Sequence, residues 1–370
     1  MPDFLVVGGG IAGASAAYFL AERGSVVLLE RESAPGYHTT GRSAALYTEA
    51  YGNATIRALT VASRPFFENP PPGFTEHPLL TPRGEMIVGP KEDETLVAEA
   101  LAVGTRFAPQ LRRISTDEAR RHCPVLDPDW LGHALFNPDA MDMDVHAIHQ
   151  GFLRGLRARG GTLLTDAEVL ALERRNGAWH ARSRHGEFDA PVVVNASGAW
   201  ADVVAQMADV RPVGLVPKRR TAFTFDPPPG LDIASWPMVI TVRETLYFKH
   251  EAGRLLVSPA DETPMEPCDA QPDEMDIALA ASRLEEATSL RIRTIPRKWA
   301  GLRSFVKDKT PVVGFAPDAE GFYWLCGQGG YGIMTSPTMG RVAAALASGR
   351  GIPAEIGVDE AALSPARSFA

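Results

Sequence analysis

Short apolar runs separated by glycine or polar turns dominate the first thirty positions of the chain. Residues 4–21 form one uncharged, mostly apolar run, long enough to suggest a membrane span or a signal peptide. No lysine or arginine precedes this run, Asp3 stands where a signal peptide carries positive charge, and glycines interrupt the run. The pattern therefore predicts no transmembrane segment here. It predicts a buried strand at 4–7, a helix at 11–22 and a second strand at 26–29.

Helical periods and strand alternation divide the rest of the chain. Two rigid Pro-rich breaks, at 69–73 and 226–230, interrupt the pattern. A strand pair is expected within 79–89 around a Pro-Arg-Gly turn, and antiparallel strands are expected at 238–242 and 246–248. The other expected helices are 56–67, 94–103, 116–121, 145–157, 276–289 and 336–348, and the other expected strands are 163–164, 168–172, 178–182, 192–194, 312–315 and 322–326.

The first strand, turn and helix carry a glycine fingerprint. Gly8 allows a tight turn, Gly10 lets the backbone approach a pyrophosphate, and Gly13 lets the helix pack closely on the strand. Phosphates would lie against the free N–H groups at the helix N-terminus. Glu30 ends the second strand, where a carboxylate can accept hydrogen bonds from ribose hydroxyls. The combination predicts a dinucleotide-binding βαβ unit and favours FAD or NAD over NADP.

The segment that follows the second strand favours FAD. An NAD dehydrogenase usually continues with further βα units, whereas residues 36–45 form a polar, turn-rich stretch that suits a loop under a flat ring system. Residues 195–200 form a second strand-to-helix turn of small residues, where backbone can approach a dinucleotide. The predicted fold is α/β: a Rossmann-like FAD-binding domain (1–75, 145–215 and 300–370) interleaved with an antiparallel-sheet α+β substrate-binding domain (76–144 and 216–299).

Composition and charge exclude several classes of protein. The 370 residues are 45% hydrophobic and 22% charged, which is ordinary for a globular chain and excludes a disordered or collagen-like one. The net charge is −8 with no basic block, which argues against nucleic-acid binding. Cys123, Cys268 and Cys326 lie far apart, which argues against a disulfide framework or a zinc cluster. We therefore expect a cytoplasmic protein, and peripheral association with the inner membrane through the electron acceptor is left open.

With these residues in view, the chain resembles the FAD-dependent D-amino-acid oxidase superfamily, which includes glycine and sarcosine oxidases, and within it the bacterial D-arginine dehydrogenases. The resemblance covers nearly the whole chain and is carried by residues 36–45, 69–85, 217–220, 299–305 and 328–333. It implies oxidative deamination of D-amino acids, with D-arginine and D-lysine favoured. Hydride would pass from Cα to the flavin, and the imino acid would hydrolyse to a 2-keto acid and ammonia. A quinone or another carrier would accept the electrons.

The same resemblance implies the residues of the substrate site. Arg220 and Arg303 would anchor the substrate carboxylate, since a planar guanidinium pairs with a carboxylate at two points, and Tyr247 would add a hydroxyl. Glu85 matches the acid that receives the guanidinium of D-arginine, and the Gly330 carbonyl would meet the substrate amine. The other implied pocket residues are Thr48, Tyr51, Met238 and Val242.

The resemblance also implies the cofactor contacts. The FAD is expected to be non-covalent, because no cysteine lies near Arg303, where sarcosine oxidase relatives attach it, and Cys326 is in a buried-strand pattern. His38 is the remaining tether candidate, and the closest relatives do not use that position. The expected cofactor-binding residues are Gly8, Gly10, Ala12, Gly13, Glu30, Arg31, Thr40, Gly41, Arg42, Ser43, Ala45, Val169, Ala196, Gly198, Gly301, Gly329, Gly330, Tyr331, Gly332 and Ile333.

Two departures from the related dehydrogenases keep the substrate open. Leu46 stands where they carry a histidine that contacts the substrate amine, and Glu49 replaces an apolar residue. Leucine can neither donate nor accept, so oxidation of a secondary amine or a 2-hydroxy acid is an alternative. An oxidase that uses O2 and a flavin-binding subunit without turnover are further alternatives, although a pure carrier needs no pair of arginines.

Several single residues also allow more than one interpretation. Arg220 could belong to a solvated strand face, Tyr247 or Met238 to the core and Glu85 to a surface strand. His146 and His149 are spaced for one helical face, but no third metal ligand is apparent, so no metal site is predicted and a helix surface is expected.

Overall fold

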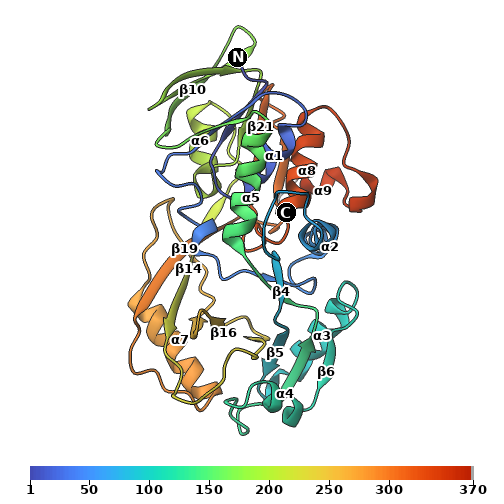
Figure 1. The fold of residues 1–370 in the computed structure, drawn as a ribbon, viewed down its shortest axis with the longest axis vertical. Helices are drawn as coiled ribbons and strands as arrows, with labels where there is room; N and C mark the ends of the chain where they lie inside the picture. Colours follow the sequence, from blue (N-terminus) through green and yellow to red (C-terminus); the bar gives the residue numbers. More distant parts are fainter. Residues whose placement is uncertain (368–370) are drawn as a thin grey trace.

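A six-stranded sheet forms the centre of the upper half of the molecule in Figure 1, a computed structural model that describes residues 1–367. Its strand order is β20-β21-β13-β1-β2-β9, and every neighbouring pair is parallel except β20 and β21. This sheet confirms the predicted Rossmann-like unit. Its strands are β1 (Phe4–Val7), β2 (Val26–Leu29), β9 (Thr162–Leu164), β13 (Val192–Asn195), β20 (Val312–Phe315) and β21 (Phe322–Cys326).

Both faces of this sheet are covered, which explains its continuous apolar strands. Phe4 and Val6 face a core shared with helices α1 (Ile11–Leu20), α5 (Val145–Ala158) and α8 (Ser336–Ala347). Leu5 and Val7 face a second core on the opposite side. That core is closed by α6 (Ala201–Met207) and by a three-stranded antiparallel sheet of β10 (Val169–Arg175), β11 (Ala178–Ser183) and β12 (Gly186–Ala190).

A nine-stranded sheet forms a second unit, lower in Figure 1. Its order is β18-β14-β17-β16-β15-β5-β7-β6, with β19 paired to β14, and all pairs are antiparallel except β5 and β15. The strands are β5 (Glu85–Gly89), β6 (Arg112–Ile114), β7 (His133–Asn137), β14 (Val216–Phe225), β15 (Met238–Thr241), β16 (Tyr247–Glu251), β17 (Arg254–Ser258), β18 (Thr263–Pro264) and β19 (Arg297–Phe305).

The remaining elements cover this second sheet or join it to the first. Helices α4 (Thr116–His122) and α7 (Glu274–Ala287) contribute to its apolar core. A small sheet orders its strands β3-β8-β4, from β3 (Leu46–Tyr47), β8 (Met141–Met143) and β4 (Leu80–Pro82). The other helices are α2 (Ala54–Glu68), α3 (Glu94–Gly104) and α9 (Glu360–Leu363), and short 3₁₀ turns occupy Thr40–Arg42, Lys91–Asp93, Gly198–Trp200 and Ala354–Ile356.

The structure corrects one expected pairing. The strands expected within 79–89 exist as β4 and β5, but they do not pair with each other, because the chain bends at Gly84 (φ +76°) and each strand joins a different sheet. Nine strands among the described residues were not predicted, namely β3, β6, β7, β8, β12, β14, β17, β18 and β19. The six-stranded sheet draws on residues 4–29, 162–195 and 312–326, and the nine-stranded sheet draws on 85–137 and 216–305. The domain boundaries expected from the sequence remain a prediction.

Among residues 1–367, none of the helices combines the length and apolar character needed to cross a bilayer.

Candidate active site

Two connected hollows lie where the two large sheets meet. The main cavity is lined by the β1–α1 turn, the end of β2, the turn after β13, and residues of β14 and β19. A smaller side pocket is lined by β5, β15 and residues 43–51. Arg220, Tyr247, Arg303 and Gly330 line both, so the side pocket opens from the main cavity.

The glycine turn is packed too tightly for side chains. Gly8 adopts φ +104°, and a Cβ there would lie 2.5 Å from the carbonyl oxygen of Ala196. A Cβ on Gly13 would lie 1.9 Å from the carbonyl oxygen of Gly8. These contacts agree with the expected close packing of helix and strand. Gly10, the N-cap of α1, provides no side-chain cap, and the Ile11 N–H donates instead to Thr40 Oγ1 at 3.0 Å, beside the main cavity.

Two buried side chains hold the middle of this turn. The Gly9 N–H donates to Glu30 Oε2 at 2.7 Å, and the Gly9 carbonyl accepts from His149 Nε2 at 2.8 Å. Burial raises the pKa of Glu30 and lowers the pKa of His149. The expectation that His149 lies on a helix surface is wrong: it is 4% exposed, because α5 packs that face against the turn. Glu30 also lines the main cavity, as expected for a ribose acceptor.

Most of the expected cofactor residues surround the main cavity. Four do not line it. Gly13 packs on Gly8, Gly41 donates its N–H to the Gly36 carbonyl at 2.7 Å, Ala45 lines the side pocket, and the Tyr331 ring lies 5.0 Å from the Tyr51 ring. The expected residues that do line it are Gly8, Gly10, Ala12, Glu30, Arg31, Thr40, Arg42, Ser43, Val169, Ala196, Gly198, Gly301, Gly329, Gly330, Gly332 and Ile333.

Residues that the sequence did not single out complete this cavity and fit a dinucleotide. Gln328 lines it with a buried Nε2 that has no hydrogen-bond partner among the described residues, a donor ready for a ligand. Val203 and Met207 line it with 42% and 36% of their surface exposed, which a flat aromatic ring would cover. These two side chains stand one helical turn apart on α6, a spacing that could have identified a common face.

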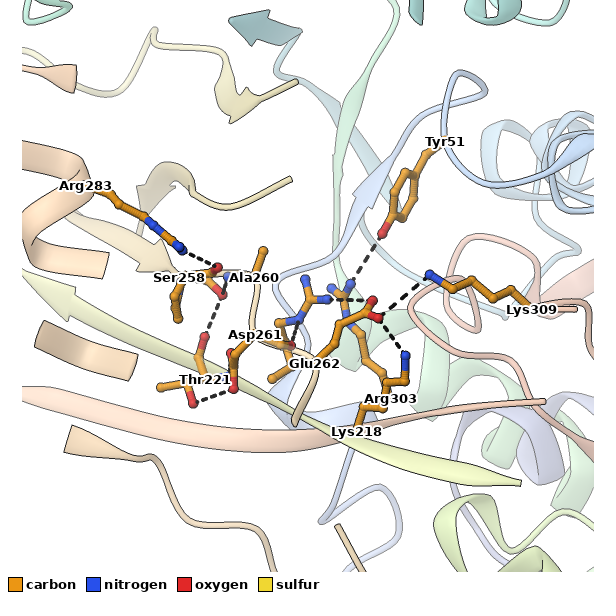
Figure 2. A network of polar contacts seen from close by, with 12 residues as sticks. Tyr51, Lys218, Thr221, Ser258, Ala260, Asp261, Glu262, Arg283, Arg303 and Lys309 are labelled. Atoms are coloured by element: carbon orange, nitrogen blue, oxygen red, sulfur yellow. Dashed lines mark hydrogen bonds and ion pairs between the residues drawn. The ribbon is translucent and has the colours of Figure 1, made fainter. Parts of the chain in front are cut away.

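Two arginines face the same side of the paired strands β14 and β19. The register places Arg220 opposite Gly301 and Arg303 opposite Lys218, so both guanidiniums point to one face. Arg220 Nε donates to the Asp261 carbonyl at 2.9 Å, and Arg303 Nη1 lies 3.5 Å from the Tyr51 hydroxyl (Figure 2). Burial and the neighbouring charge of Arg303 lower the pKa of Arg220.

The side pocket also contains a buried carboxylate. Glu85 is 6% exposed and accepts a hydrogen bond from Thr48 Oγ1 at 2.8 Å, which removes the surface-strand interpretation. Among the described residues, Glu85 has no ion-pair partner, and burial raises its pKa. Thr48, itself 4% exposed, accepts in turn from Asn137 Nδ2 at 3.3 Å.

Apolar side chains form the wall of the side pocket. Met238 pairs with Glu85 across the parallel strands β15 and β5, and Ile240 follows on the same face. Leu46 packs with them in one cluster. The expectation that Val242 contacts the substrate is wrong, because β15 ends at Thr241 and Val242 packs against a different core. Eight of the nine residues expected at the substrate site line this pocket, namely Thr48, Tyr51, Glu85, Arg220, Met238, Tyr247, Arg303 and Gly330.

A cavity built on a Rossmann-like turn and joined to a polar side pocket is the arrangement of a nucleotide-dependent enzyme. Residues 3–346 match the family DAO, described as FAD dependent oxidoreductase. The chain belongs to this family, and its cofactor is FAD.

Individual relatives agree with this assignment. A glycine oxidase of Bacillus licheniformis is 27% identical, and the alignment covers 95% of each chain. The glycine oxidase structure from Geobacillus kaustophilus superposes with a TM-score of 0.85 at 20% identity and covers 99% of both chains. The L-proline dehydrogenase structure from P. horikoshii gives a TM-score of 0.83 at 22% identity and covers 95% of both. These similarities confirm the predicted α/β fold with a second unit.

Proposed function

We propose that this flavoprotein oxidises D-amino acids, with basic ones such as D-arginine and D-lysine favoured, to the 2-keto acid and ammonia. The observation that carries the proposal is the charge distribution of the side pocket. Two arginines, the buried carboxylate of Glu85 and the exposed carboxylate of Glu244 line it, and Glu85 pairs with neither arginine. Such a pocket suits a ligand that carries a carboxylate and, separately, a cationic group.

The arginines supply the carboxylate site. Arg303 has no carboxylate within ion-pair distance among the described residues, and the two guanidiniums repel each other. An incoming carboxylate would relieve that repulsion and form charge-assisted hydrogen bonds with planar donors. The hydroxyls of Tyr51 and Tyr247 lie beside the same groups and can donate to the remaining lone pairs.

Glu85 supplies the site for a cationic side chain. A buried carboxylate without a counter-charge is unfavourable, and a guanidinium or ammonium placed against it removes that penalty. The apolar wall of Met238, Ile240 and Leu46 suits the methylene groups between such a cation and Cα. The preference for the D configuration rests on the sequence resemblance.

The side pocket opens directly to the main cavity, where the cofactor would lie. When bound, FAD supplies the two-electron acceptor for the hydride that leaves Cα. The residues of the chain orient the substrate so that Cα faces the main cavity. Because Leu46 offers no polar atom, the contact with the substrate amine falls to the Gly330 carbonyl. Water then hydrolyses the released imino acid, and a quinone or another carrier reoxidises the protein.

Oxidation of a secondary amine or a 2-hydroxy acid is the second candidate, and Leu46 is the observation that favours it. Its apolar side chain in the pocket tolerates an N-alkyl group, or an oxygen in place of the amine, better than a histidine would. An enzyme of this kind would still use the two arginines, but it would not need Glu85.

Anaerobic mixing of the purified holoenzyme with a substrate panel separates these candidates. The panel contains D-arginine, D-lysine, D-methionine, D-leucine, L-arginine, sarcosine and a 2-hydroxy acid, and the flavin absorbance is followed before air is admitted. Bleaching by the basic D-amino acids with slow recovery in air supports a dehydrogenase, and fast recovery supports an oxidase. Bleaching by sarcosine or the hydroxy acid alone would overturn the proposal in favour of the second candidate.

A further inference from the structure

A second carboxylate lies beside the proposed carboxylate site. Glu262 lies on the segment between β17 and β18, where three cations surround it (Figure 2). Its carboxylate is 2.8 Å from Lys218 Nζ, 3.4 Å from Arg220 Nη2 and 3.7 Å from Lys309 Nζ. Arg220 is therefore already ion-paired with a carboxylate of the protein, Glu262, before any substrate binds.

The backbone on either side of this contact is fixed to β14. Ser258 Oγ donates to the Thr221 carbonyl at 2.6 Å, and the Thr221 N–H donates to Asp261 Oδ1 at 2.6 Å. Arg220 Nε donates to the Asp261 carbonyl. These contacts tie the segment to β14, the strand that carries Arg220, so rotation of the Glu262 side chain, which is 32% exposed, suffices to exchange its partners.

We infer that Glu262 is ion-paired with Arg220 in the free protein. When the substrate carboxylate binds Arg220, Glu262 gives up this ion pair and stays paired with Lys218 and Lys309. This inference rests on the proposed function, in which Arg220 binds that carboxylate. The distances support the exchange: the contact with Arg220 is the longer hydrogen bond, and the contact with Lys218 is the shorter one. Glu262 would thus keep a cationic partner at every stage.

The exchange makes Glu262 a positioning residue that sets affinity and not the rate of the chemical step. Its negative charge competes with the incoming carboxylate for Arg220, so substrate and product both bind less tightly than the arginines alone would allow. Although burial opposes ionisation, the hydrogen bond from Lys218 and the charges of Lys309, Lys218 and Arg220 lower the pKa of Glu262. The competing charge is therefore present at neutral pH.

Carboxylate binding to the holoenzyme tests the inference. Acetate is titrated at low ionic strength by calorimetry, and anaerobic flavin reduction by D-lysine gives a Kd and a limiting rate. For Glu262→Gln we expect the acetate Kd to fall about tenfold, which corresponds to about 1.4 kcal/mol, with the limiting rate unchanged. Glu266→Gln, which removes the same charge from an exposed position just after β18, is the matched control and should leave both unchanged. An unchanged or weaker acetate affinity in Glu262→Gln would overturn the inference.

A second variant keeps the test valid if Glu262→Gln folds poorly. Lys309, whose side chain is 53% exposed, can be changed to methionine without disturbing the core. Without Lys309, Glu262 turns more fully to Arg220, and the acetate Kd should rise about threefold; in the Glu262→Gln background that rise should vanish. An equal rise in both backgrounds contradicts the inference. The variant Arg220→Lys tests the proposed function separately from the inference about Glu262. If acetate binds this variant as tightly as the unchanged protein, Arg220 does not bind the substrate carboxylate, and the proposed function is wrong.

Discussion

Replacement of Glu85 by glutamine should change which substrates reduce the flavin. The variant keeps the size of the side chain and a hydrogen-bond acceptor for Thr48, but it removes the charge that a cationic substrate side chain would contact. Two unit charges about 4 Å apart attract by about 4 kcal/mol at an effective dielectric constant of about 20, and lost hydration of the cation offsets part of this. A net loss of about 2 to 3 kcal/mol lowers kcat/KM for D-arginine and D-lysine roughly 30- to 150-fold.

The same substitution should leave flavin reduction by apolar substrates such as D-leucine unchanged. In the free protein the buried Glu85 has a raised pKa, so the neutral amide should also raise the thermal unfolding midpoint slightly. The assay is anaerobic flavin reduction with D-lysine and D-leucine, and Glu49→Gln is the control, since Glu49 bonds the Tyr47 hydroxyl and does not line the side pocket. Equal losses with D-lysine and D-leucine would refute the assignment, as would unchanged kinetics with D-lysine.

Three further predictions concern the other parts of the site. The double variant Arg220→Leu, Arg303→Leu should retain FAD but show no reduction by any amino acid, and a normal flavin content with fast bleaching would contradict the carboxylate site. Gly13→Ala should lose flavin and about 1 to 3 kcal/mol of stability, measured by denaturant unfolding, because its Cβ meets the Gly8 carbonyl; a fully loaded, stable variant would contradict the packing argument. His149 has a lowered pKa in the folded protein, so the unfolded state binds more protons, and stability should fall as the pH drops below 6.5. Thermal melts between pH 7 and about 5 should show a smaller fall in stability for His149→Gln than for the unchanged protein. The same pH dependence in both proteins would contradict this effect of His149.

The parts of the fold that could be predicted are those that local sequence determines. The β1–α1–β2 unit follows the prediction to within two residues, because its periodicity and its glycines act over short distances. Strands β14 and β19 could not be paired from the sequence, since Arg220 lies opposite Gly301, about eighty residues further along the chain. That register, and not the residues themselves, brings Arg220 and Arg303 together.

The candidate site rests on a different kind of prediction from the fold. The residues of the side pocket came from the resemblance, which transfers long-range contacts without deriving them. Two expectations were wrong for different reasons. Val242, which the resemblance implied, lies beyond the end of its strand. His149 was assigned to a helix surface from its spacing with His146, and it is buried. The spacing of His149 with Phe152 and Leu156 could have placed it on the buried face of α5.

The central claim is that the two arginines and Glu85 select a basic D-amino acid for oxidation by the flavin. The most direct test measures single-turnover ammonia release from the anaerobic holoenzyme with D-lysine and, separately, L-lysine. The account predicts flavin bleaching by D-lysine with about one ammonia and one 2-keto acid for each flavin reduced, and no bleaching by L-lysine. Bleaching by both enantiomers, or by neither, would contradict it.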